Sequence, residues 1–195
     1  MNVILFDNNR ATYYPLSFTR PIAYFRVGIL TIKEKWEKYY KQVSVRTEDY
    51  LSQKFPLKIQ QDNLWVNAKI LPTQDLVTEL NSLRAGESLE KNKEIIAFRS
   101  ATFDSKKTNK IASNIVLRSI NNLCDIFLLN GEEIKNDFNL LFPKKKSKWQ
   151  GDIKGLEKVK KTNIRIGNYP IYIEEGAELN QCILNATDGP IYIGR

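Results

Sequence analysis

The sequence predicts an α/β fold in which a mostly parallel, doubly wound (Rossmann-like) sheet is followed by the start of a hexapeptide-repeat β-helix. Over residues 1–141, short apolar runs alternate with segments of helical periodicity, which is typical of such a sheet. A basic segment follows at 142–161, and the tetrapeptide Pro-Ile-Tyr-Ile occurs twice within 162–195. We therefore expect an α/β domain, a basic linker and the beginning of a β-helix over these three ranges.

The first unit of the α/β pattern is a strand, a long polar loop and a helix. Asn2 to Phe6 is an apolar run that ends at Asp7, a residue type that favours turns. Three arginines lie on the loop that follows: Arg10, Arg20 and Arg26. From Ile29 onward apolar residues recur at helical spacing, which predicts a helix. Ligands of open α/β sheets bind beyond the carboxyl ends of strands, so we expect the site on this loop.

The other elements of the domain follow from further apolar runs and capping signals. We expect strands at 42–46, 64–67, 94–99 and 115–118. We expect helices at 47–54, 74–83, 122–130 and 132–141. The polar stretch SATFDSKKTNK separates the last two predicted strands and is predicted to be a loop.

The chain contains no histidine, which limits its chemistry. Mechanisms that need imidazole are excluded for these residues, including Ser-His and Cys-His nucleophile pairs and histidine-ligated zinc. Chemistry performed by cations, carboxylates and metal ions is compatible with the composition, and nucleotidyl transfer is of this kind. Cys124 and Cys182 make no C-x-x-C pair, which argues against a zinc site or a redox motif.

The net charge of +8 is concentrated in one segment, because residues 141–161 hold eight lysines against Asp152 and Glu157. Such a run favours a solvated linker over a nucleic-acid contact, and Trp149 alone is interleaved with it as a stacking residue. The sequence has no run approaching the ~18 apolar residues of a membrane helix and no signal-peptide pattern. We therefore expect no membrane partner, no nucleic-acid partner and a cytoplasmic location.

The repeated tetrapeptide indicates a solenoid. Its copies begin at Pro170 and Pro190, 20 residues apart. One coil of a hexapeptide β-helix takes roughly 18 residues, so the offset fits one coil with a short insertion near Asp188 and Gly189. A pair of ordinary hairpins is the alternative. Because a solenoid coil cannot bury its apolar face alone, we expect the β-helix to continue beyond Arg195 and the chain to form homo-oligomers through it.

The segment from Pro15 to Ile32, PLSFTRPIAYFRVGILTI, resembles the signature of sugar-1-phosphate nucleotidyltransferases. That signature is a G-x-G-T-R loop, then P-L-T-x-T-R-P-K-P and a helix. The chain is similar to divergent members resembling the bifunctional N-acetylglucosamine-1-phosphate uridylyltransferase, in which a left-handed β-helix follows the nucleotide-binding domain. CDIFLLNGEEIKNDFNLL and PIYIEEGAELNQCILNATDGPIYIGR also fit that group. The resemblance implies Mg²⁺-dependent joining of a nucleoside triphosphate and a sugar 1-phosphate, with release of pyrophosphate.

The resemblance also implies a nucleotide-binding loop directly after the first strand. Arg10 matches the arginine of G-x-G-T-R and would contact the triphosphate, which makes it an expected catalytic residue. Asp7, Asn8 and Asn9 stand where the family has small residues, and with Arg10 they are the expected nucleotide-binding residues. This substitution leaves less room for phosphate and places a carboxylate near an anion, although Asn can adopt the left-handed backbone conformation.

The second part of the signature supplies the remaining expected site residues. Arg20 matches the arginine of T-R-P and is the second expected catalytic residue. Ile22 stands where the family has a lysine, so Arg20 or Arg26 has to take over its charge. Arg26 and Asn67 are expected to bind the sugar phosphate. An alanine follows Asn67 where the family supplies a magnesium ligand, so no metal ligand is assigned.

Two classes of function stay open. The first is the nucleotidyltransferase that the resemblance implies. The second is a catalytically weak or silent module that binds a nucleotide or sugar phosphate and scaffolds a larger, acyltransferase-like β-helix protein. The missing glycines and the missing lysine keep the second class open, and pyrophosphate release separates the two.

Overall fold

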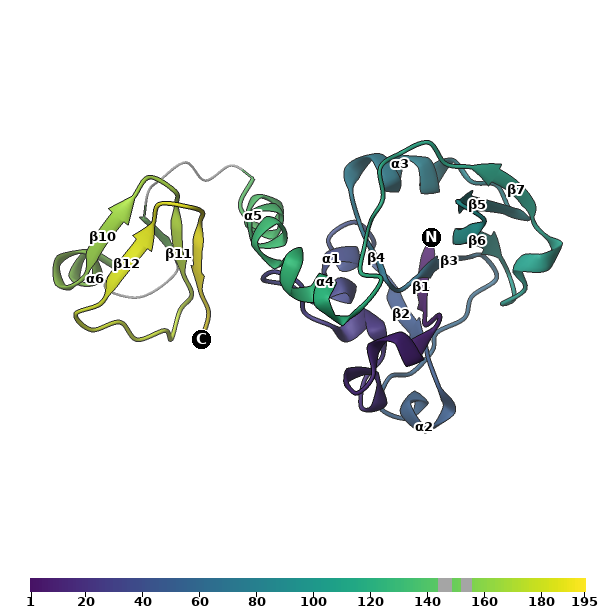
Figure 1. Ribbon diagram of the computed structural model, residues 1–195, viewed down its shortest axis with the longest axis horizontal. Coiled ribbons are helices and arrows are strands. Elements are labelled where there is room, and N and C mark those ends of the chain that lie inside the picture. The colour runs from purple at the N-terminus through teal and green to yellow at the C-terminus, as the bar shows by residue number, and fades with distance from the viewer. Residues whose placement is uncertain (144–148, 152–155) are drawn as a thin grey trace. The chain divides into compact units, whose positions relative to one another are not determined.

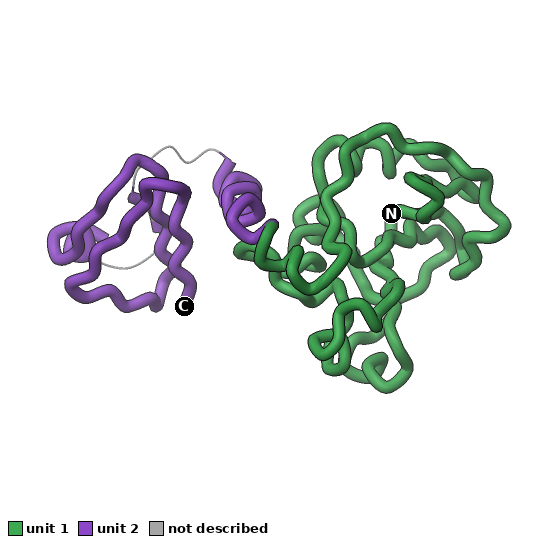
Figure 2. Tube along the Cα trace, viewed as in Figure 1, with its two compact units in different colours: residues 1–128 green, residues 129–195 purple. Residues whose placement is uncertain are grey.

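The structure is a computed structural model that describes residues 1–143, 149–151 and 156–195. The chain divides into two compact units, unit 1 at Met1–Leu128 and unit 2 at Leu129–Arg195 (Figures 1 and 2). Within the described ranges, no helix has the length and apolar character needed to cross a membrane.

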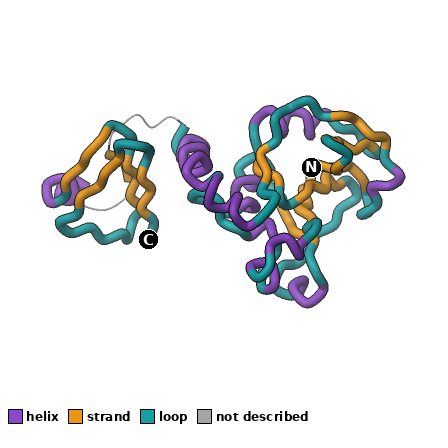
Figure 3. The backbone as a smooth tube through the Cα atoms, in the orientation of Figure 1, coloured by secondary structure: helices purple, strands orange, loops and turns teal. Residues whose placement is uncertain are grey.

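Unit 1 is built on a six-stranded sheet with the order β2-β1-β3-β6-β5-β7. Its strands are β1 (Asn2–Phe6), β2 (Val43–Arg46), β3 (Asn63–Asn67), β5 (Glu87–Lys91), β6 (Glu94–Ser100) and β7 (Asn109–Ala112). β1 pairs in parallel with β2 and β3, and β5 pairs in parallel with β7, whereas β6 is antiparallel to both of its neighbours. The sheet and its helices (Figure 3) form the mixed, mostly parallel α/β architecture that the sequence predicts.

Short helices and one small ribbon complete unit 1. The α-helices are α1 (Ile32–Glu37), α2 (Asp49–Ser52), α3 (Gln74–Ser82) and α4 (Leu123–Leu128). The 3₁₀ turns are η1 (Arg10–Tyr13), η2 (Leu16–Phe18), η3 (Ile22–Tyr24) and η4 (Ser105–Lys107). The ribbon pairs β4 (Ile70–Leu71) with β8 (Arg118–Ser119) in antiparallel orientation.

The first helix begins later than the predicted residue Ile29, because a capping box sets its start at Thr31. The Thr31 hydroxyl accepts a hydrogen bond from the Glu34 backbone N–H at 3.2 Å, and the Glu34 carboxylate accepts one from the Thr31 N–H at 2.7 Å. Gly28, at φ 90°, turns the chain before this cap.

The sheet contains two strands that the apolar pattern does not predict, and one predicted strand is wrong. β5 reads ESLEK and β7 reads NKIA, so neither shows an apolar run, and β7 occupies part of the predicted polar loop. Both are strands because β6 and β5 supply hydrogen-bonding partners. The strand predicted at 115–118 is wrong, since only Arg118–Ser119 is extended there and it lies outside the six-stranded sheet.

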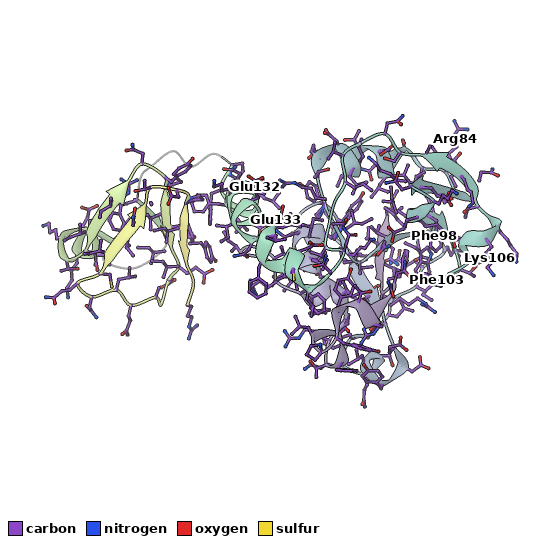
Figure 4. All side chains as sticks on the ribbon, in the orientation of Figure 1. Arg84, Phe98, Phe103, Lys106, Glu132 and Glu133 are labelled. Carbon is purple, nitrogen blue, oxygen red and sulfur yellow. The ribbon has the colours of Figure 1, made fainter. Side chains whose placement is uncertain are left out.

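An aromatic cluster fills one face of the sheet. Phe6, Trp65 and Phe98 are buried side by side with Ile4. Phe103, from the loop after β6, packs on all three rings at centroid distances of 5.3, 5.2 and 5.6 Å; Phe98 and Phe103 are labelled in Figure 4. A loop side chain therefore contributes to the cover of this face.

Unit 2 contains parallel strands separated by short connections. Its elements are α5 (Asn130–Leu141), β9 (Trp149–Gly151), α6 (Leu156–Thr162), β10 (Ile164–Gly167), β11 (Ile171–Ile173), β12 (Ile183–Ala186) and β13 (Ile191–Ile193). β10 pairs with β12, and β11 pairs with β13 and β9, all in parallel. The alternative of ordinary hairpins is wrong for these strands, because hairpin strands are antiparallel.

Apolar side chains from the strands and from α6 form the core of unit 2. The buried members of this core are Val159, Ile171, Ile173, Ala177 and Ala186. These residues include both isoleucines of the first Pro-Ile-Tyr-Ile copy. The strand residues of that copy therefore point alternately into the core, as the period-2 pattern predicts.

Helix α5 and the residue that follows it pack within unit 2. The Phe142 ring stacks on the Tyr172 ring with a centroid distance of 3.9 Å. The compact units therefore divide before α5, whereas the predicted domain boundary follows residue 141. The predicted linker at 142–161 contains β9 and all but the last residue of α6, and its lysines at 144–146, 148 and 154 lie outside the described residues. The three predicted domain ranges stay a prediction.

Candidate functional site

The carboxyl ends of β1, β2 and β3 meet at one edge of the sheet because the three strands are parallel. Asp7 N donates to the Arg46 carbonyl at 3.0 Å, and Ala68 N donates to the Phe6 carbonyl at 3.0 Å. The segments that leave the three strands are therefore adjacent. The loop carrying the predicted arginines begins at this edge, where open α/β sheets bind ligands.

Asp7 and Arg10 form a buried ion pair at the start of this loop. Their side chains are 3% and 8% exposed, and Arg10 Nη1 lies 2.5 Å from Asp7 Oδ2. Asp7 Oδ2 also accepts from Thr47 Oγ1 at 2.6 Å, and Asp7 Oδ1 accepts from Ile22 N at 2.9 Å. Burial raises the pKa of the Asp7 carboxyl, although these hydrogen bonds and the Arg10 charge act in the opposite direction.

The remaining donors of Arg10 also point to protein acceptors. Nη1 donates to Thr47 Oγ1 at 2.9 Å, and Nη2 donates to Tyr50 Oη at 3.1 Å and to the Ser17 carbonyl. Nε lies 3.9 Å from a carboxylate oxygen of Glu48. The structure thus places Arg10 inside an internal network, and its predicted contact with a triphosphate stays a prediction.

Asn8 and Asn9 are exposed where the chain turns between β1 and η1. Asn9 adopts the left-handed conformation, with φ 51° and ψ 48°. Asparagine tolerates this conformation better than most residues, so the turn forms without the glycines of the family signature. The nucleotide contacts predicted for Asp7, Asn8 and Asn9 stay predictions.

A cavity of about 510 Å³ lies beside the second half of the loop. Its lining residues are Thr19, Arg20, Tyr24, Arg26, Thr31, Lys54 and Phe55. Arg20 and Arg26 come from the loop after β1, whereas Lys54 follows α2, which itself follows β2. The structure therefore brings two predicted arginines and one further cation to the same cavity.

The sides of this cavity combine positive charge with aromatic surface. The Tyr24 and Phe55 rings contact each other with a centroid distance of 4.5 Å. Among the described lining residues none is acidic, and the nearest carboxylate that pairs with them is Glu34, 3.9 Å from Arg26 Nη2. An anion with an apolar or aromatic portion fits this lining.

Asn67 lies at the carboxyl end of β3 and is fully buried. Its Nδ2 lies 3.3 Å from Glu94 Oε1, and its Oδ1 accepts from Lys69 N at 3.3 Å. Lys69 Nζ lies 2.7 Å from Glu94 Oε2 and 3.1 Å from Asn121 Oδ1. Lys69, Glu94 and Asn121 line a second cavity of about 320 Å³. Asn67 does not line this cavity, but it forms hydrogen bonds with Glu94 and Lys69, which do.

Sequence patterns do not single out Lys54, Thr47 or Tyr50 as site residues. All three lie shortly after β2. Because parallel neighbouring strands end at the same edge of a sheet, the segment after β2 could have been expected to lie beside the loop after β1. Ile22, which replaces the family lysine, is fully buried and contributes its backbone N–H to Asp7. It is therefore a core residue.

The use of Mg²⁺ that the resemblance implies stays a prediction. Asp7 uses both carboxylate oxygens on protein donors, and the side chain of Ala68 has no ligand atom. Across the described ranges, no group of three or more Cys, Asp or Glu side chains is placed to hold a metal ion. No residue of the chain is therefore assigned to Mg²⁺.

The mixed α/β unit, with its mostly parallel sheet and the basic loop after its first strand, fits a Rossmann-like nucleotidyltransferase fold. The family described as Sugar nucleotidyl transferase matches residues 3–146, and the chain belongs to this family. A search of curated proteins gave no match. Membership implies nucleotide and sugar-phosphate substrates in general. The closer likeness to the N-acetylglucosamine-1-phosphate uridylyltransferase stays a prediction.

Proposed function

We propose that this protein joins a nucleoside triphosphate and a sugar 1-phosphate to give a nucleotide sugar and pyrophosphate. The observation that carries the proposal is that Arg20, Arg26 and Lys54 line the same cavity, in a chain of the sugar nucleotidyl transferase family. Guanidinium groups bind phosphate oxygens in bidentate geometry, and an ammonium adds a compact charge.

In this reaction a phosphate oxygen of the sugar 1-phosphate attacks the α-phosphorus of the nucleotide. The bond from that phosphorus to the β-phosphate oxygen breaks, and its electron pair leaves with pyrophosphate. Both reactants are anions, so the cations must offset their repulsion and the charge that develops on the leaving group. We assign this task to Arg20, Arg26 and Lys54, with Tyr24 and Phe55 offering stacking surface to a ring. Mg²⁺ is proposed only as an ion that accompanies the nucleotide.

We propose that the sugar hydroxyls are held beside Asn67, in the second cavity. Glu94 and Lys69 line that cavity, and both form hydrogen bonds with Asn67. A carboxylate and an ammonium provide acceptors and donors for hydroxyl groups. Glu94→Gln is expected to raise the KM for the sugar 1-phosphate more than the KM for the nucleotide. Equal changes in the two constants would contradict this placement.

Pyrophosphate release, measured over a panel of nucleoside triphosphates and sugar 1-phosphates, tests the proposed reaction. Arg20→Ala and Lys54→Ala are each expected to lower kcat/KM roughly 10- to 100-fold, the effect of losing a charge-assisted contact. Arg84→Ala and Lys106→Ala are matched controls, because both side chains are exposed and lie near β5 and β7, on other elements than the cavity (Figure 4). Absence of release together with absence of a ligand-induced thermal shift would overturn the proposal.

A second candidate function is a module that binds nucleotide or sugar phosphate without turnover and scaffolds a β-helix protein. The burial of Arg10 in the ion pair with Asp7 favours it, because that arginine is the signature residue expected on the triphosphate. Saturable nucleotide binding without pyrophosphate release would support this candidate over the transferase.

We also propose that unit 2 is the beginning of a left-handed β-helix through which the chain forms homo-oligomers. The parallel pair β10–β12 places Ile164 opposite Ile183, 19 residues on, and β11–β13 places Ile171 opposite Ile191, 20 residues on, which supports a coil repeat of about 20 residues. An experimental structure that shows a right-handed coil would contradict the handedness. A cytoplasmic location is part of the proposal, and fractionation of cells expressing the tagged chain tests it.

A further inference from the structure

We propose that Arg10 and Tyr50 are positioning residues that hold the segment carrying Arg20 against the cavity. The proposal rests on the proposed function, in which Arg20 binds phosphate. It assigns Arg10 to the support of the site and gives Tyr50 a role that no sequence pattern indicates.

Arg10 is buried, and its hydrogen-bond donors are directed to other groups of the protein. Its side chain is 8% exposed, and its two terminal nitrogens share four acceptors. These acceptors are Asp7 Oδ2, Thr47 Oγ1, the Ser17 carbonyl and Tyr50 Oη. A guanidinium has five N–H donors, so four of them are already directed to protein atoms, and Asp7 offsets the charge. A phosphate could bind Arg10 only by displacing these partners.

Tyr50 extends this network to the loop. Its hydroxyl accepts from Arg10 Nη2 at 3.1 Å and donates to the Phe18 carbonyl at 2.8 Å. The Tyr50 side chain is 65% exposed, so its contribution is this bridge and not core packing. The bridge joins the helix after β2 to the loop after β1.

The network holds the backbone on both sides of Arg20. On the amino side, the Phe18 carbonyl is bound by Tyr50, and the Ser17 hydroxyl donates to the Arg10 carbonyl at 2.8 Å. On the carboxyl side, Ile22 N donates to Asp7 Oδ1 at 2.9 Å. Pro21 also restricts the backbone between these anchors. Arg20 is therefore presented to the cavity by a segment whose conformation is set before ligand binds, which lowers the ordering cost of binding.

Tyr50→Phe tests the proposal because it removes the bridging hydroxyl and leaves the charge and the aromatic ring in place. With inorganic pyrophosphate as the probe, the Kd is expected to rise about fivefold, the effect of losing one hydrogen bond. Tyr169→Phe, a change at an exposed tyrosine of unit 2, is the matched control and should leave the Kd unchanged. An unchanged Kd in Tyr50→Phe would overturn the proposal.

A double-mutant cycle with Arg20→Ala separates positioning from direct binding. If Tyr50 and Arg10 act through Arg20, then Tyr50→Phe and Arg10→Lys should cause almost no further rise in Kd when Arg20 is already alanine. Arg10→Lys keeps the positive charge but loses the planar fork. If its effect on the Kd is added in full to that of Arg20→Ala, Arg10 binds phosphate directly and the proposal is overturned.

Hydrogen exchange without ligand keeps this inference distinct from the proposed function. Amides in the segment 17–22 are expected to exchange faster in Tyr50→Phe than in the unchanged protein, while those of β3 keep their rates. If the unchanged protein binds no pyrophosphate, the proposed function fails, and faster exchange would still show that Tyr50 fixes the loop. Equal exchange rates would overturn the positioning role whatever the ligand result.

Discussion

Ile171 lies directly opposite Ile191 in the parallel pair β11–β13, and the two residues hold the same position in successive Pro-Ile-Tyr-Ile copies. The neighbouring tyrosines, Tyr172 and Tyr192, stack with their rings 8° from parallel and their centroids 5.7 Å apart. In the first copy the isoleucines lie in the core of unit 2, and Tyr172 is buried against the Phe142 ring; in the second copy all three strand residues are half-buried. The two copies of the sequence repeat therefore pair residue for residue as neighbouring strands, as successive coils of a solenoid do.

Close approach of two strands in unit 2 predicts that Gly167 cannot be replaced. Gly167 ends β10 with φ 86°, and a Cβ atom there would lie 2.2 Å from the Ala186 carbonyl oxygen. Gly167→Ala should lower the free energy of unfolding of unit 2 by about 1 to 3 kcal/mol for the backbone strain, and the clash with the carbonyl oxygen should add to this loss. Thermal unfolding followed by circular dichroism measures the change.

Gly131→Ala is the matched control for that substitution. Gly131 lies in α5, and a Cβ atom there would meet no atom within 4 Å apart from its chain neighbours and the adjacent backbone of its own helix. Alanine favours a helix by up to about 1 kcal/mol over glycine, so this variant should unfold at the same or a higher temperature. Equal destabilisation by the two substitutions would contradict the close approach at Gly167.

The aromatic cluster predicts a large loss of stability when its central ring is removed. Trp65 lies on β3, the strand between β1 and β6, and is fully buried in contact with Phe98 and Phe103. Trp65→Ala should reduce the free energy of unfolding by about 3 to 5 kcal/mol. Phe103→Ala should cost less, about 1 to 2 kcal/mol, because Phe103 is 40% exposed. Urea unfolding gives both values, and a larger loss for Phe103→Ala would contradict this order.

The ion pair between Asp62 and Arg99 predicts a dependence of stability on acidic pH. Arg99 donates from Nε and Nη2 to the two Asp62 oxygens at 2.8 and 2.7 Å, which lowers the pKa of Asp62 below its usual value of 3.8. The pair therefore contributes stability above that usual value, and the contribution is lost as the pH falls through the lowered pKa.

Asp62→Asn should remove this part of the pH dependence and should lower stability at neutral pH. Because the Asp62 side chain is 46% exposed, solvent screening limits the loss to about 1 kcal/mol or less. Unfolding measured from neutral to strongly acidic pH shows the effect. In an Arg99→Met background the substitution should have no effect, and a persistent effect would assign the pH dependence to another partner of Asp62.

The proposed homo-oligomer predicts that charges on the β10–β12 ribbon reduce self-association. Ile164 and Ile183 are opposite each other in this ribbon and are 61% and 65% exposed. Exposed apolar side chains that lie together favour an interface. Ile164→Lys with Ile183→Lys should lower the mass measured by sedimentation, whereas Val116→Lys, at an exposed position of unit 1, should not. A monomeric unchanged protein would contradict the oligomer.

The sequence alone was sufficient for elements whose signals are local. The apolar run that ends at Phe6 predicts β1, and the predicted helix at 74–83 agrees with α3, which Thr73 caps. The same is true of the repeat that pairs Ile171 with Ile191. The signature segment also led to the family that matches the chain.

Only the tertiary structure determined the features that depend on contacts between residues distant in the chain. β5 and β7 are polar and become strands because neighbouring strands supply their hydrogen bonds, and the direction of β6 follows from its pairing with β3. Arg10 and Arg20 look alike on the linear chain, but burial and the acceptors gathered from three segments direct Arg10 inward and leave Arg20 at a cavity. Residue type and spacing determine local conformation and charge, whereas the partner of a charged side chain is set by which segments the packed sheet brings together.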